Sequence, residues 1–131
     1  MPELSELQIC LAALLLFQLK HWVFDFLLQT TYQLRNKGKF GHPGGLIHAG
    51  GHALGSIPVL LLMSPGRNWI IGLAVAEFVV HYLCDWVKER MNRTQGWTME
   101  NREFWLALGA DQAFHQLTYI AMVTAALIVA Q

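Results

Sequence analysis

Four long apolar segments constrain the fold of this chain more than any other feature. Short connections containing Pro or Gly, such as "MSPGRN", separate them. Each segment is close to or above the roughly 20 residues that a helix needs to cross a bilayer, and none alternates as an amphipathic strand would. A backbone that spans a bilayer must satisfy its own hydrogen bonds, which favours helices. We therefore predict helices over about residues 7–34, 46–63, 69–91 and 102–130.

Short connections between consecutive helices predict an up-down-up-down bundle. The expected fold class is an all-α membrane protein with four transmembrane helices in a single domain over residues 1–131. A soluble four-helix bundle is the alternative, but its helices would normally carry polar faces that are missing here. The stretch before the first apolar segment carries acids and no Lys or Arg, so a cleavable signal peptide is not expected.

Basic residues predict the orientation in the membrane. The first connection and the region around the third contain Arg35, Lys37, Lys39, Lys88, Arg90, Arg93 and Arg102. The second connection, on the opposite side, contains only Arg67. The positive-inside rule then places the first and third connections in the cytoplasm and both termini outside.

Each predicted helix carries a pair of ionisable residues spaced four apart. The pairs are His21 and Asp25, His48 and His52, His81 and Asp85, and Asp111 and His115. This spacing puts both side chains on one helix face. A single pair would ordinarily be a polar contact between helices, but an Asp inside a bilayer costs roughly 2.5 to 3.5 kcal/mol. Four pairs together favour a metal site, because a divalent cation neutralises carboxylates and binds imidazole nitrogen.

The positions of the pairs predict one layer and two similar halves. The pairs lie late in odd-numbered helices and early in even-numbered ones, so they meet in a layer roughly 15 Å deep toward the predicted cytoplasmic side. "HWVFD" matches "HYLCD", which predicts two similar helical hairpins that supply four ligands each. We predict two divalent metal ions, with one ion and hydrogen-bonding neighbours as the alternative. Zinc is favoured, with iron and manganese as alternatives.

Glu77 stands apart from the symmetric set. It lies one turn before His81, and the corresponding position in the first half is Phe17. A purely structural site would not need this extra carboxylate. We predict that Glu77 is a catalytic general base beside a metal-bound water, with a further metal ligand as the alternative.

Three further polar residues are candidates for contacts with ligands or substrate. Gln29 and Gln112 are predicted to orient metal ligands or to hold a substrate carbonyl. Lys88 is expected to extend to the membrane interface, with pairing to Asp85 or binding of a lipid phosphate as alternatives. His42, beside Pro43, is expected to be exposed.

Several motifs resemble those of a known family. They are "HWVFDFLLQ", "NK" at Asn36 and Lys37, "HAGGH", "HYLCDWVK" and "DQAFHQ". Together they resemble the domain-of-unknown-function 3307 family of small bacterial membrane proteins. The resemblance implies a multi-pass protein of the bacterial cytoplasmic (inner) membrane and brings no established activity. Membrane zinc hydrolases of the ceramidase and progestin-receptor type are similar only in using His and Asp from transmembrane helices.

Three functional classes fit the pattern. The favoured one is a dinuclear metal-dependent hydrolase of a lipid or lipid-like ester, amide or phosphoester, which would use a metal-activated water. The alternatives are a divalent-metal carrier, which would prefer fewer and weaker ligands near the midplane, and a di-iron oxidative enzyme. Haem would leave the three aspartates unexplained.

The expected partners are the lipid bilayer and a lipid substrate. Nine basic and nine acidic residues give no indication of nucleic-acid binding. A homo-oligomer is compatible with the pattern.

Overall fold

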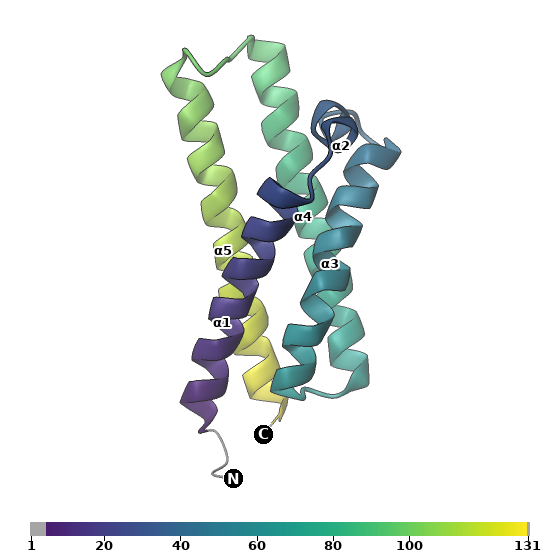
Figure 1. Ribbon diagram of the computed structural model, residues 1–131, viewed down its shortest axis with the longest axis vertical. Helices are drawn as coiled ribbons and strands as arrows, with labels where there is room; N and C mark the ends of the chain where they lie inside the picture. Colours follow the sequence, from purple (N-terminus) through teal and green to yellow (C-terminus); the bar gives the residue numbers. More distant parts are fainter. Residues whose placement is uncertain (1–4, 131) are drawn as a thin grey trace.

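The computed structural model describes residues 5–130, and these residues form helices and no strand. The elements are α1 (Glu6–Trp22), the π-helix η1 (Val23–Leu27), α2 (Thr31–Asn36), α3 (Pro43–Met63), α4 (Arg67–Gln95) and α5 (Arg102–Ala130). Four spans are long and apolar enough to cross a membrane: Glu6–Leu27, α3, α4 and α5. They run alternately up and down the bundle (Figure 1), which confirms the predicted fold class. The similarity of the two hairpins stays a prediction.

The expectation of one continuous helix over residues 7–34 is wrong. α1 passes into η1 at Val23, and the chain leaves the helix before α2 begins at Thr31. Thr30 Oγ1 accepts from the Gln33 backbone N–H at 3.2 Å, and Gln33 Oε1 accepts from the Thr30 N–H at 2.8 Å. This reciprocal capping box starts a new helix. α2 therefore lies across the bundle axis at one end of the molecule, called the α2 end below (Figure 1).

Two other helices are longer than expected. α3 begins at Pro43 rather than near residue 46, and Pro is well suited to the first helical position. The His42 ring caps this helix, because its Nδ1 accepts from the Gly44 N–H at 3.0 Å. His42 is thus half-buried, and its expected exposure is wrong. α4 extends to Gln95, where Gly96 ends it at a φ of 69°.

The interior changes character along the bundle axis. Toward the end where α1 begins and α5 finishes, α1, α3 and α5 share a packed apolar core. This apolar core consists of Ala13, Phe17, Val59, Leu60, Met63, Tyr119, Met122, Val123 and Ala126. The Phe17 and Tyr119 rings stack at a centroid distance of 4.9 Å. Toward the α2 end, the buried side chains are mostly histidines, carboxylates and lysines.

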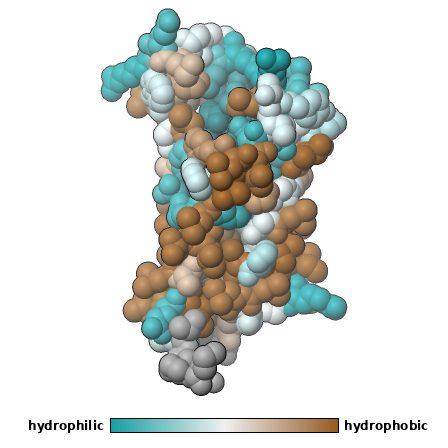
Figure 2. Space-filling model, in the orientation of Figure 1, coloured by the Kyte–Doolittle hydropathy of each residue, from teal (hydrophilic) through white to brown (hydrophobic). Residues whose placement is uncertain are grey.

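The outer surface of the spans is apolar. Large hydrophobic side chains such as Leu11, Leu54, Val75 and Leu117 are more than half exposed. Figure 2 shows hydrophilic side chains gathered at the α2 end and a largely hydrophobic surface below it. An apolar exterior around buried ionisable groups is the arrangement of a membrane protein rather than of a soluble bundle.

Candidate metal centre

The four predicted pairs converge inside the bundle. Asp25 is half-buried and the other seven residues are buried. Within the pairs, the Nε2 atoms of His21, His81 and His115 lie 3.1, 3.5 and 3.4 Å from carboxylate oxygens of the aspartates one turn away. The eight residues, with Lys20, Lys37, Glu77 and Lys88, form what we call the polar layer. The sequence therefore predicted correctly that these side chains share one region.

One group in the polar layer combines a carboxylate with three imidazoles. Asp25, His48, His52 and His81 offer ligand atoms that all lie within 4.8 Å of one another. Asp25 Oδ1 lies 3.1 Å from both His48 Nε2 and His52 Nε2. The Nε2 atoms of His48 and His81 are 3.3 Å apart. Such a set suits zinc, iron or manganese.

Local backbone features bring this group together. Asp25 lies in the π-helix η1, and short π-helical segments within α-helices are frequent at functional sites. Opposite it, Gly51 and Gly55 leave room on α3. A Cβ at Gly51 would lie 3.0 Å from the Phe24 ring, and a Cβ at Gly55 would lie 2.8 Å from the same ring. These glycines let α1 and η1 approach α3 closely.

A second group overlaps the first. His81, Asp85 and His115 also offer ligand atoms within 4.8 Å of one another, so His81 belongs to both groups. His115 Nε2 is 3.7 Å from Asp85 Oδ1. The structure thus contains two donor groups with a shared member.

His21 and Asp111 lie beside the two groups and belong to neither. His21 Nδ1 is 2.9 Å from the Tyr119 hydroxyl, and its Nε2 is 3.1 Å from Gln112 Oε1. Asp111 Oδ2 accepts from Lys88 Nζ at 3.1 Å. Their predicted roles as metal ligands stay predictions, and in the structure they hydrogen-bond with protein groups.

Three lysines turn into the bundle and pair with carboxylates. Lys20 pairs with Glu77 at 2.5 Å, Lys37 with Asp85 at 3.2 Å and Lys88 with Asp111 at 3.1 Å. The expectation that Lys88 extends to the interface is wrong, and Lys37 is not a surface charge. Buried carboxylates attract these long side chains inward because an unpaired buried charge is very costly.

Asp25 differs from the other carboxylates of the polar layer. Among the described residues, its ion-pair partners within 4.0 Å are the histidines His21, His48 and His52, with no lysine among them. Asp25 is therefore the carboxylate of the polar layer for which a metal ion would be the natural counter-charge.

Glu77 lies between the polar layer and the apolar core. Its side chain is only 1% exposed, and Oε1 accepts from Lys20 Nζ. The same ammonium donates to the Tyr119 hydroxyl at 3.0 Å and to the His52 carbonyl at 3.2 Å. Glu77 is in neither donor group. Its role as a general base stays a prediction.

Both predicted glutamines contact predicted ligands. Gln29 Nε2 is 3.4 Å from His48 Nδ1 and 3.3 Å from His48 Nε2. Gln112 Oε1 lies next to His21 Nε2, and Gln112 Nε2 donates to Asp111 Oδ2 at 3.3 Å. Both are placed to orient these side chains.

Three residues that contact the polar-layer groups were not predicted from the sequence: Lys20, Lys37 and Tyr119. Tyr119 continues the four-residue spacing of Asp111 and His115 by one turn, so the sequence pattern could have placed it on the same helix face. A lysine inside an apolar segment also demands a buried partner. The identity of that partner is set by how the helices pack, as Lys20 and Glu77 come from different helices.

Unpartnered polar atoms gather in the same region. Buried side-chain atoms without a hydrogen-bond partner among the described residues include His52 Nδ1, Glu77 Oε2, His81 Nδ1, Asp111 Oδ1 and His115 Nε2. Such atoms are rare in folded proteins. Their concentration here fits a centre that could hold a metal ion.

The fold and the buried His/Asp groups define a class: a helical bundle with four candidate membrane spans around a candidate metal centre. The chain belongs to the family described as "Protein of unknown function (DUF3307)", whose match covers residues 11–131. This confirms the resemblance seen in the sequence motifs. No curated protein and no solved structure matches the chain.

Proposed function

We propose that the protein is a membrane-embedded metal-dependent hydrolase that acts on a lipid or lipid-like ester, amide or phosphoester. The observation that carries the proposal is the buried donor group of Asp25, His48, His52 and His81. Zinc is the favoured ion, with iron or manganese as alternatives, because the donors are imidazole and carboxylate. Zinc can expand to five ligands, which would leave room for a water beside four protein donors.

The charges of the polar layer support one ion rather than two. Asp85 and Asp111 already have lysine partners at 3.2 and 3.1 Å. A second ion at His81, Asp85 and His115 would lie close to the Lys37 ammonium and would share His81 with the first ion. The proposal therefore places one ion at Asp25 and departs from the two ions expected from the duplicated sequence pattern.

A divalent ion bound there would polarise a carbonyl or phosphoryl oxygen of the substrate and activate a water molecule. The water oxygen would bond to the acyl carbon or phosphorus. Its proton would go to Glu77 Oε2, the oxygen that has no protein partner, and from there to the departing alcohol or amine. Lys20 would hold Glu77 in place through Oε1, and Gln29 would orient the His48 ring through its contact with Nδ1.

The apolar core favours a hydrolase over a divalent-metal carrier. A carrier needs its site to be reachable from both sides of the membrane. Below the polar layer, Phe17, Leu60 and Tyr119 are at most 1% exposed and fill the bundle interior. A di-iron oxidative enzyme, the other alternative, would need the second ion that Lys37 opposes.

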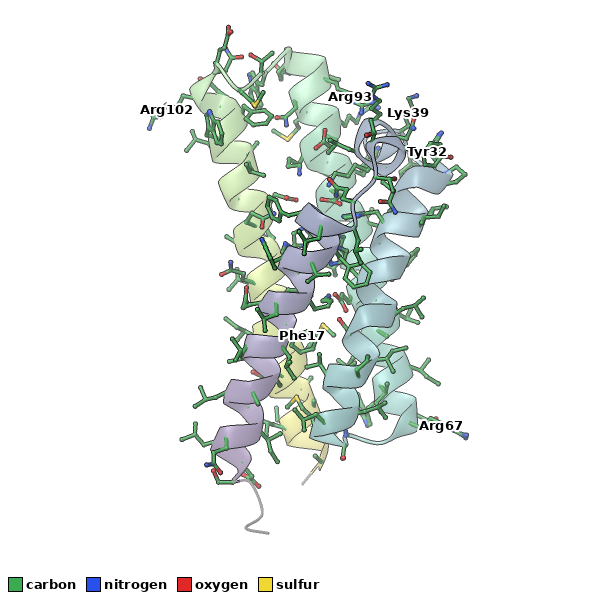
Figure 3. The ribbon with its side chains drawn as sticks, in the orientation of Figure 1. Phe17, Tyr32, Lys39, Arg67, Arg93 and Arg102 are labelled. Carbon is green, nitrogen blue, oxygen red and sulfur yellow. The ribbon has the colours of Figure 1, made fainter. Side chains whose placement is uncertain are left out.

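We further propose that the α2 end faces the cytoplasm of a bacterium, with the chain in the cytoplasmic membrane. Without the inward-facing Lys37 and Lys88, the basic residues of the α2 end are Arg35, Lys39, Arg90, Arg93 and Arg102. Figure 3 shows Lys39, Arg93 and Arg102 at this end and Arg67 at the other. The positive-inside rule then supports an orientation with both termini outside and the centre toward the cytoplasmic side.

The test is metal content and turnover of protein purified in mild detergent without chelator. We expect one ion per chain in the wild type, none in Asp25→Asn, and one in the matched variant Asp111→Asn, whose carboxylate lies outside both donor groups. No ion in the wild type, even after reconstitution with zinc, iron or manganese, would overturn the metal centre. A loaded protein that cleaves no ester, amide or phosphoester in a lipid panel would overturn the hydrolase. Two ions would restore the dinuclear alternative.

A further inference from the structure

A groove between α4 and α5 reaches the polar layer from the side of the bundle. Its volume is about 340 Å³. Its apolar wall includes Leu83, Val87, Met91, Ala107, Ala110 and Phe114. The small side chains of Ala107 and Ala110 leave the hollow open on the α5 side.

The mouth of this groove lies on the apolar outer surface of two candidate spans. Leu83, Val87, Met91 and Phe114 are between 41% and 59% exposed. Side chains of this kind on a membrane span face lipid rather than water. The molecules that meet this opening are therefore acyl chains, and the wall matches them chemically.

The inner end of the groove is polar. Lys88 and Asp111 line it, and Lys88 Nζ also lies 3.4 Å from Glu89 and 3.9 Å from Asp85. Asp85 also pairs with Lys37 at 3.2 Å, so three carboxylates face two ammonium groups, and this end does not favour an anionic headgroup such as a phosphate. An anion would meet more negative than positive charge.

Asp111 Oδ1 is buried and makes no hydrogen bond with the described residues, and its ion-pair contact is His115 Nε2 at 3.4 Å. The Asp111 side chain is 2% exposed. His115 Nε2 likewise makes no hydrogen bond within the described part of the chain. A carboxylate oxygen accepts hydrogen bonds, so it requires a donor such as a hydroxyl or an amide N–H. A buried acceptor left unpaired costs about 1–3 kcal/mol, which a suitable ligand would recover.

We infer that this groove binds a single-chain amphiphile with an uncharged headgroup that carries a hydroxyl or amide N–H. The acyl chain lies along Leu83, Val87 and Phe114, and the headgroup donates to Asp111 Oδ1. The His115 ring connects this position to the metal centre, since it stacks on His81 at a centroid distance of 4.1 Å. The inference rests on the proposed function and specifies its substrate class as neutral monoacyl esters or amides that enter from the bilayer.

Cys84 lines the groove and offers a native reporter. In a Cys10→Ser background, Cys84 is the single cysteine, and its rate of modification by N-ethylmaleimide can be followed by mass spectrometry. The protein would be placed in phosphatidylcholine nanodiscs, because the phosphatidylcholine headgroup has no hydrogen-bond donor. The probe is 1-O-dodecylglycerol, whose ether bond the proposed hydrolase does not cleave, and dodecyl methyl ether is the control with the same chain and no donor.

We expect a probe concentration of about ten times Kd to slow modification about tenfold, while dodecyl methyl ether slows it much less. Ala110→Leu should fill the groove and remove this dependence on probe. The matched variant Ala113→Leu, at an exposed α5 position outside the groove, should retain it. No protection by 1-O-dodecylglycerol at saturation, or equal protection by dodecyl methyl ether, would overturn the inference.

Metal content measured on the same samples separates the two proposals. Protein that binds metal and shows no protection contradicts the groove while leaving the metal-dependent function intact. Protein that shows protection and binds no metal supports the amphiphile site and contradicts the metal-dependent function.

Discussion

The two halves of the bundle interior are held together by different physics. In the half that contains the apolar core, the side chains of Phe17, Leu60 and Tyr119 pack together and are at most 1% exposed. In the half toward α2, the interior is built from histidines, carboxylates and lysines. Lipid chains are as apolar as a leucine core, so the membrane provides little hydrophobic drive for helix association. Packing must therefore hold the first half together, and specific polar pairing the second.

The difference also indicates where function lies. The outer surface is apolar around both halves, so the exterior does not distinguish them. A packed apolar interior tolerates many sequences of similar volume. A buried polar layer is stable only if each charge has its partner. A single substitution in the polar layer should therefore lower stability by leaving the partner of the removed group buried and unpaired.

The largest effect is expected at Lys20, where the two halves meet. Lys20→Met leaves Glu77 buried without its ammonium, and breaking a buried pair costs about 3–5 kcal/mol. The double variant Lys20→Met/Glu77→Met should recover most of this loss, because it removes both charges. Denaturant unfolding in detergent measures the effect. Lys39→Met is the control, because Lys39 is exposed and its ammonium donates to nearby Asn36. A loss as large as that of Lys20→Met would contradict the role of the pair.

The second-largest effect is expected from removing the metal, which should affect the polar layer and not the apolar core. At metal concentrations of 100 to 1,000 times Kd, bound metal stabilises the folded state by about 2.7–4.1 kcal/mol. Removing it should lower Tm by about 10 °C for a chain of this size. Leu60→Ala, in the apolar core, should lower the starting Tm and keep the same chelator response. Asp25→Asn should lose the response. Thermal unfolding with and without chelator measures all three, and identical responses would mean that the halves are not distinct.

Sequence patterns predicted the four spans and the four His/Asp pairs, but they did not predict which side chains contact one another. Hydropathy identifies four spans because their apolar runs are long. Spacing identifies the pairs because a four-residue step defines one helix face. Spacing says nothing about how each helix is rotated against its neighbours, so it could not foresee that His21 would bind Tyr119 and Gln112.

Two predictions from sequence were wrong for different reasons. The capping box at Thr30 lies within a long apolar run, and the run alone suggested a continuous helix. Lys37 and Lys88 have long side chains that can reach either the interface or an internal carboxylate. The choice depends on Asp85 and Asp111 being within reach in three dimensions, which sequence separation does not show.

Glu77→Gln tests whether the boundary between the halves takes part in chemistry. Gln keeps the shape and can still accept a hydrogen bond from Lys20, but it cannot take up a proton. We expect the bound metal to be retained and turnover to fall on the order of 10²-fold, as for a lost general base. The measurements are kcat on a cleaved lipid analogue and metal content of the same sample. Unchanged kcat would remove Glu77 from the mechanism, and loss of the metal would make it a ligand.

The smallest effect is expected at Gln29, at the edge of the polar layer. Gln29 is half-buried and uncharged, and its Nε2 lies 3.4 Å from His48 Nδ1, so its removal leaves no buried charge behind. Residues that orient a metal ligand typically contribute 10- to 100-fold in affinity. Since Gln29 contacts a single ligand, we expect Gln29→Ala to weaken metal binding by about tenfold, at the low end of that range. Unfolding of the metal-free protein should be unchanged, because the apolar core is untouched. Competition titration against a fluorescent chelator measures the affinity, and Gln116→Ala, at an exposed position of α5, is the matched control. Equal metal affinities for the two variants would show that Gln29 does not orient His48 for metal binding.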